Sequence, residues 1–191
     1  MGRREKVEVN DMSRKVVWDW GEKLSHEQIK AVENLWNIKF PKEYVEIIKE
    51  YDGATAKLEI DGVKYKYCGI DIPKWHGGRS GLYLLEYNGY GDVNTWSIVR
   101  TYEAFKECLP NLKKYFRLLE MLGGDIFFFD YRHSDTEPSI IFLPHNESVT
   151  EDEIDEDDLE ERTLAEWQDL TLYKVADSFS EFLDKITPDE D

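Results

Sequence analysis

The sequence predicts an α+β fold, a single domain in which helices pack against a mixed, largely antiparallel β-sheet. Apolar residues recur at helical spacing in the N-terminal third and again near the C-terminus, and at strand spacing between these regions. Turn residues separate the short apolar runs in the middle of the chain, as they do in antiparallel sheets. The 191 residues contain no repeat and no linker that would separate two folded units, so we expect one domain.

The first predicted helix begins after Ser25. Its hydroxyl can accept a hydrogen bond from the amide of Gln28, whose side chain can return the bond. Leu24 can pack on Ile29 across this helix start, and apolar residues follow at helical spacing as far as Trp36.

Pro41 opens a second predicted helix, at a position where its missing amide donor costs nothing. Gly53 supplies the C-terminal stop. The apolar stripe of this helix consists of Tyr44, Ile47, Ile48 and Tyr51.

Residues 58–67 are predicted to form a β-hairpin, because they contain an Asp-Gly dipeptide at 61–62 that favours a two-residue turn. In this register Ile60 faces Val63. Leu58 then faces Tyr65, so one face of the hairpin is apolar.

The middle of the chain is less regular. Residues 73–81 are typical of a loop and residues 82–86 of a strand, and Thr101 can cap a helix that Pro110 stops. Residues 112–122 fit either a helix or a strand. Two apolar runs follow, DIFFFDYR at 125–132 and PSIIFLPH at 138–145, which we expect to pair as buried strands.

A final amphipathic helix is predicted after Ser178. Its apolar stripe consists of Phe179, Phe182, Leu183 and Ile186. The chain therefore divides into a charged N-terminal extension (1–23), the folded domain (24–186) and a short acidic tail (187–191). An acidic insertion at 147–163 lies within the domain.

Three stretches carry a resemblance to a known family: LWNIKFPKEYVEIIKEYDGA (35–54), GGDIFFFDYRHSDTEPSIIFLPHN (123–146) and ADSFSEFLDKI (176–186). Their order and spacing resemble the SMI1/KNR4 family of the SUKH superfamily. The resemblance implies an α+β fold with a mixed sheet. In bacteria it implies an immunity protein that neutralises a polymorphic toxin, commonly a nuclease or deaminase. In fungi it implies a regulator of cell-wall synthesis that acts through protein interactions.

The acidic tract is the most extreme feature of the chain. Residues 151–161 read EDEIDEDDLEE, with nine carboxylates in eleven positions, and the chain as a whole has a net charge of -17. Such a block repels itself and holds water, so it is excluded from a packed core. It attracts basic surfaces and repels nucleic acids and anionic membranes. The alternative interpretation is a solvated loop that only aids solubility.

The sequence indicates no residues for catalysis or metal binding. The four histidines and the two cysteines, Cys68 and Cys108, show no metal-ligand spacing, and both cysteines fit reduced thiols. Asp125, Asp130 and Asp135 recur around a predicted hairpin, where structural roles are favoured over acid–base work. Asp125 can complete the Gly-Gly turn before it, and Asp130 can pair with Arg132 or with a helix end. We expect no enzyme, no cofactor and no metal.

The start of the chain lacks an apolar signal region, and no apolar run is long enough for a membrane span, so we expect a cytoplasmic protein. Because of the negative net charge, we expect it to bind neither nucleic acid nor membrane. Our hypothesis is an immunity protein that blocks a toxin with a basic surface by stoichiometric binding. A regulatory scaffold is the alternative, followed by a small-ligand binder or enzyme that uses the loop at Trp75-His76.

The predicted partner-binding residues are Glu151, Asp152, Glu153, Asp155, Glu156, Asp157 and Asp158 for steering, and Tyr83, Tyr87, Tyr90 and Trp96 as anchors.

Overall fold

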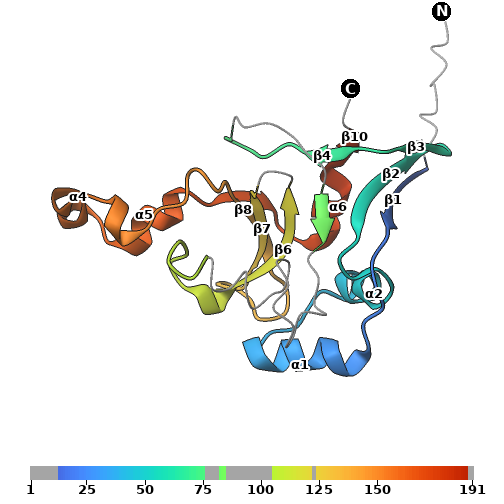
Figure 1. Ribbon diagram of the computed structural model, residues 1–191, viewed down its shortest axis with the longest axis horizontal. Coiled ribbons are helices and arrows are strands. Elements are labelled where there is room, and N and C mark those ends of the chain that lie inside the picture. Colours follow the sequence, from blue (N-terminus) through green and yellow to red (C-terminus); the bar gives the residue numbers. More distant parts are fainter. Residues whose placement is uncertain (1–12, 76–81, 85–104, 122–123, 189–191) are drawn as a thin grey trace, which may run out of the picture.

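The computed structural model describes residues 13–75, 82–84, 105–121 and 124–188. It confirms the α+β fold class. One large sheet has the strand order β1-β2-β5-β6-β7-β8-β9, with β3 also paired to β2, and a small second sheet joins β10 to β4 (Figure 1). Every strand pairing among the described residues is antiparallel.

Two helices lie between β1 and β2, and the remaining described α-helices follow β8. The strands are β1 (Arg14–Asp19), β2 (Thr55–Ile60), β3 (Val63–Tyr65), β4 (Cys68–Ile70), β5 (Leu82–Leu84), β6 (Tyr115–Met121), β7 (Ile126–Asp130), β8 (Ser139–Leu143), β9 (Tyr173–Ala176) and β10 (Ile186–Pro188). The helices are α1 (His26–Trp36), α2 (Lys42–Tyr51), α4 (Glu156–Glu161), α5 (Leu164–Leu170) and α6 (Phe179–Lys185), with short 3-10 turns η1 (Leu112–Lys114) and η2 (Glu151–Glu153).

Helices α1 and α2 form as the local sequence predicts. The amide of Gln28 donates to the Ser25 hydroxyl at 3.2 Å, and the Gln28 side chain accepts from the Ser25 amide at 2.9 Å, so the predicted capping box is confirmed. In α2 the proline occupies the cap position itself, one residue before the first helical residue. Gly53 follows α2 with a φ of 75°, as expected of a helix stop.

The hairpin of β2 and β3 has the predicted register, with Ile60 opposite Val63 and Leu58 opposite Tyr65. Its two turn residues both have positive φ, 50° at position 61 and 82° at position 62, as a type I′ turn requires. The apolar face is covered only in part: Leu58 is buried, whereas Val63 on the short strand β3 is 56% exposed.

In the ambiguous segment 112–122, the described residues 112–121 form the turn η1 and then strand β6. Strand β6 has an apolar core on each of its faces, with Tyr115 in one and Phe116 in the other, so the run shows no clean alternation of buried and exposed residues. A bulge between Arg117 and Leu119 also shifts the register, which leaves both Leu118 and Leu119 fully buried.

The large sheet separates two apolar cores, and strand β7 contributes to both. Phe127 and Phe129 point into the main core together with residues of α1, α2 and α6. Ile126 and Phe128 point into a second core on the opposite face. The remaining buried members of the second core are Cys108, Leu109, Tyr115, Ile141 and Leu143, and Phe105, Leu112 and Leu172 pack against it.

Helix α6 closes the main core and confirms the predicted C-terminal helix, except that Ile186, which was placed in its apolar stripe, reaches the main core as the first residue of β10. Ser178 caps it by accepting a hydrogen bond from the amide of Glu181 at 3.1 Å. Phe179 and Phe182 are buried, and Phe182 meets Phe127 edge-on with ring centres 5.3 Å apart. The paired strands β7 and β8 are likewise confirmed.

Strand β1 lies within the segment that the sequence assigned to an N-terminal extension. It pairs with β2 over its full length, and Trp18 joins the main core. The folded unit therefore starts before residue 24. The charged residues at Arg14, Lys15 and Asp19 concealed this strand, because an edge strand leaves half of its side chains in water.

Candidate functional site

The acidic tract forms part of a helical arm, residues 150–170, which consists of η2, α4 and α5. Figure 1 shows α4 and α5 standing out to one side of the sheet, on the side away from β1 and β2. All nine carboxylates of residues 151–161 are exposed, while Ile154 and Leu159 are half-buried. The tract therefore stays out of the cores as expected. The tract is solvated but is largely helical, so the alternative interpretation is wrong about a loop, whereas a role in solubility alone stays a prediction.

Two capping motifs start η2 and α5, the elements on either side of the acidic helix α4. The amide of Thr150 donates to the carboxylate of Glu153 at 2.9 Å, and that of Thr163 donates to Glu166 at 2.8 Å. The amide of Glu166 returns a bond to the Thr163 hydroxyl. Both are Thr-x-x-Glu sequences, which are helix-start signals that the sequence analysis missed. Carboxylates in a first helical turn also interact favourably with the helix dipole.

The cap of α5 gives a testable prediction. Hydrogen bonds from the Thr163 amide and hydroxyl lower the pKa of Glu166 below its ordinary value of 4.5. In Thr163→Ala the hydroxyl is lost and the amide remains, so we expect that pKa to rise toward 4.5. The helix itself should lose about 1 kcal/mol of stability.

The stability that this cap gives to α5 depends on pH in a direction set by the lowered pKa of Glu166. The folded-state pKa of Glu166 lies below the unfolded value, so this cap stabilises α5 at pH above 4.5 and is lost as the pH falls through the folded value. A carbon-detected NMR titration of the Glu166 carboxyl measures the pKa. Thr136→Ala, in a loop before β8, is the control and should leave it unchanged. An equal pKa in wild type and Thr163→Ala would contradict the assignment.

The arm is fixed to the body of the protein by Gln168. This side chain is 3% exposed, and its Nε2 donates to the carbonyl oxygens of Glu107 at 2.6 Å and Val149 at 3.2 Å. Nearby, Leu172 packs against the second core. A buried amide that bonds two separate chain segments holds α5 in one position.

An ion-pair cluster makes a second attachment between the arm and the body. The guanidinium of Arg132 binds both carboxylate oxygens of the buried Asp130 and also binds Asp169 of α5 at 2.6 Å. It lies over the ring of Tyr115 at 5.2 Å. Hydrogen bonding to Asp130 raises the pKa of Arg132, so the guanidinium remains charged. The predicted pairing of Asp130 with Arg132 is confirmed.

Within the arm, Trp167 joins α5 to α4. Its Nε1 donates to the carbonyl oxygen of Asp158 at 3.2 Å, and the guanidinium of Arg162 lies 5.0 Å from the ring centre. These contacts orient the two helices relative to each other. Together with the attachments at Gln168 and Arg132, they make the arm a pre-formed acidic surface.

At the base of the arm, Glu147 has a structural role although it belongs to the acidic insertion. It accepts hydrogen bonds from Trp75 Nε1 at 3.0 Å and from the Tyr173 hydroxyl at 2.6 Å. The bond to this carboxylate raises the pKa of Tyr173. Trp75 packs on Phe142, with ring centres 4.7 Å apart. Glu147 therefore ties the segment before β5 to strand β9.

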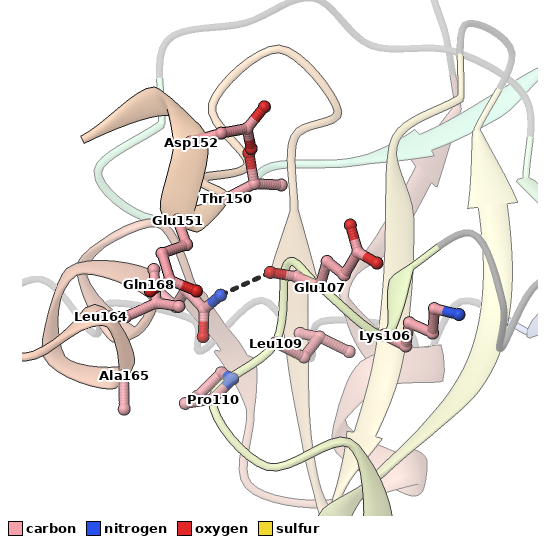
Figure 2. Close-up of a pocket in the computed structure, with 10 residues that line it drawn as sticks. All are labelled: Lys106, Glu107, Leu109, Pro110, Thr150, Glu151, Asp152, Leu164, Ala165 and Gln168. Carbon is pink, nitrogen blue, oxygen red and sulfur yellow. Dashed lines mark hydrogen bonds between the residues drawn. The ribbon is translucent and has the colours of Figure 1, made fainter.

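A groove of about 730 Å³ lies between the arm and the body. Figure 2 shows residues 106–110 on one side of it and η2 with the start of α5 on the other, bridged by the hydrogen bond of Gln168. The apolar lining comes from Leu109, Pro110, Leu164 and Ala165, and the acidic lining from Glu107, Glu151 and Asp152.

The sequence that folds into these elements can be compared with known protein families. The model of the SMI1 / KNR4 family (SUKH-1) matches residues 23–185, which is most of the chain. The chain belongs to the SMI1/KNR4 family. No curated protein matches it. In this SMI1/KNR4 protein, no helix within the described ranges has the length and apolarity needed to cross a membrane.

The predicted partner-binding residues of this SMI1/KNR4 protein fall into two groups. The seven acidic residues lie together on η2 and α4 and at the short connection between them. Tyr83 lies on β5, where its Cα is opposite Thr55 and Glu120. Tyr87, Tyr90 and Trp96 lie outside the described residues, so their role as anchors stays a prediction.

The three aspartates considered for acid–base work make separate contacts in the family fold. Asp125 accepts from the amide of His145 and lies 2.8 Å from its Nδ1, while Asp130 binds Arg132 and Asp135 binds Lys114. Within the described ranges, no group of three His, Cys, Asp or Glu side chains could hold a metal ion. Of the loop at Trp75-His76, His76 lies outside the described residues.

Proposed function

We propose that this SUKH-1 protein is an immunity protein that neutralises a cognate toxin by stoichiometric binding. The observation that carries the proposal is the pre-formed acidic arm, with nine exposed carboxylates on a support fixed by Gln168 and Arg132. A segment that served solubility alone would not need a buried amide and an ion-pair cluster to hold it in place.

Charge favours a toxin that acts on nucleic acid. Such a toxin needs a basic surface to hold its substrate, and an acidic inhibitor can occupy that surface. With a net charge of -17, this protein attracts a basic partner over long distances and repels nucleic acid. Because the arm is already ordered, little conformational entropy is lost on binding.

In this proposal the protein acts by occlusion and performs no chemistry of its own. It meets the toxin in the cytoplasm, where the nucleic acids of the cell need protection. The acidic arm steers the encounter, and the aromatic residues Tyr83, Tyr87, Tyr90 and Trp96 supply binding energy once the surfaces meet.

The test has two steps. The tagged protein is first purified from its source cells, and a polypeptide that co-purifies in near-equal amount is identified. That polypeptide is then produced in a host with and without this protein, and growth is measured. Arrested growth that this protein restores supports the immunity function. A partner that is not toxic, or that belongs to cell-wall or signalling systems, overturns it and favours the regulatory alternative.

A further inference from the structure

We infer that the groove between the arm and residues 106–110 receives an arginine side chain from a basic protein partner. This inference deepens the proposed function, because it assigns a docking position on the arm. The arginine stem would lie on the apolar floor, and its guanidinium would meet the acidic rim.

The floor of the groove suits an alkyl stem. Leu109 is buried in the second core and presents its edge to the groove, next to Pro110. Leu164 and Ala165 of α5 form the facing wall. Gln168 closes the bottom with an Nε2 that already donates to two carbonyl oxygens, so it leaves no donor there that would oppose a cation. Arginine buries its methylene groups on such surfaces and keeps its charged end near water.

The rim carries negative charge that no described residue neutralises. Glu107 and Glu151 are exposed and line the groove, and neither forms an ion pair with a described residue. Lys106 is the basic residue among the described lining residues, and Figure 2 shows its side chain pointing away from η2 and α5. An apolar floor with an acidic rim is complementary to one long cationic side chain, and arginine is the charged residue enriched at interface hot spots.

The experiment titrates the full chain with two blocked pentapeptides, Gly-Gly-Arg-Gly-Gly and the same peptide with citrulline, which has a closely similar stem and no charge. Amide chemical shifts are followed by NMR. We expect the arginine peptide to perturb residues 106–110, 150–152 and 164–168, and the citrulline peptide to bind more weakly. Perturbations elsewhere, or equal binding of the two peptides, would overturn the inference.

Two matched variants separate the groove from the general field of the arm. Glu107→Gln with Glu151→Gln removes two charges at the rim, and Glu160→Gln with Glu161→Gln removes two from α4 outside the groove lining. The rim variant should bind the arginine peptide about fivefold more weakly than the α4 variant, as expected for two partly exposed ion pairs. Equal weakening by both variants would show that only the long-range field acts.

A third variant tests the shape of the groove. Ala165→Leu adds bulk to the α5 wall with a good helix former, and we expect it to reduce peptide binding without changing net charge. The growth assay distinguishes this inference from the proposed function. If Ala165→Leu and the rim variant weaken peptide binding as expected yet restore growth as wild type does, immunity stands and the assignment of the groove to the partner is wrong.

Discussion

Neutralising three carboxylates of α4 is expected to slow association with the toxin about tenfold at low salt, the lower end of what electrostatic steering provides. The variant carries Glu156→Gln, Asp157→Asn and Asp158→Asn. These side chains are exposed first-turn residues, so the helix loses part of its dipole interaction but keeps the hydrogen bond from Trp167 to the backbone carbonyl of Asp158. Their field reaches the partner before contact, whereas the formed complex depends on close packing. The dissociation rate should therefore change little.

The matched control removes three charges from α2, with Glu43→Gln, Glu46→Gln and Glu50→Gln, all exposed. Figure 1 shows α2 on the opposite side of the sheet from α4. Stopped-flow association is measured from low to physiological salt, where charges beyond about 8 Å are screened. The wild-type rate should fall steeply with salt and the α4 variant much less. If both triple variants slow association equally, net charge and not the arm governs the encounter.

The parts of the fold that the sequence predicted are those with local signals. A capping box defines α1, a proline and a glycine bracket α2, and an Asp-Gly turn sets the register of β2 and β3. Each of these signals acts within a few residues. Strand β6 was ambiguous because burial on both faces and a bulge erased its period.

The arm shows the opposite case. The exposure of the acidic tract could be predicted from its charge density. Its helical structure was not predicted, because the acidic composition favoured a solvated loop over the two Thr-x-x-Glu helix-start signals. Its attachment was beyond prediction from local pattern. Gln168 bonds a carbonyl 61 residues earlier in the chain, and Arg132 reaches Asp169 across 37 residues. Such contacts exist only after the sheet has brought the segments together.

Gly21→Ala is expected to lower the free energy of unfolding by about 3 to 5 kcal/mol, a loss that only backbone strain or a disrupted core normally produces. Gly21 has a φ of 100°, and a Cβ built there would lie 2.7 Å from the carbonyl carbon of Tyr51 and 2.8 Å from the carbonyl oxygen of Asp52. Those atoms belong to the end of α2, so no flexible side chain can move aside.

The close approach at Gly21 is enforced by a backbone bridge. The amide of Glu22 donates to the carbonyl oxygen of Asp52 at 2.9 Å, and the amide of Asp52 donates back to Glu22 at 2.8 Å. This bridge joins the turn after β1 to the end of α2. An added methyl group must either break both hydrogen bonds or displace β1, which pairs with β2 along its whole length.

Gly62→Ala is the matched control, because it separates the cost of positive φ from the cost of the clash. Gly62 has a φ of 82° in the hairpin turn, and no atom lies within 4 Å of a built Cβ. The control should lose only about 1 kcal/mol, the conformational cost of a left-handed alanine. Urea unfolding followed by fluorescence measures both. Equal losses of unfolding free energy in the two variants would mean that the backbone bridge between Glu22 and Asp52 shifts to admit the methyl group at no free-energy cost. In that case β1 is only loosely joined to α2.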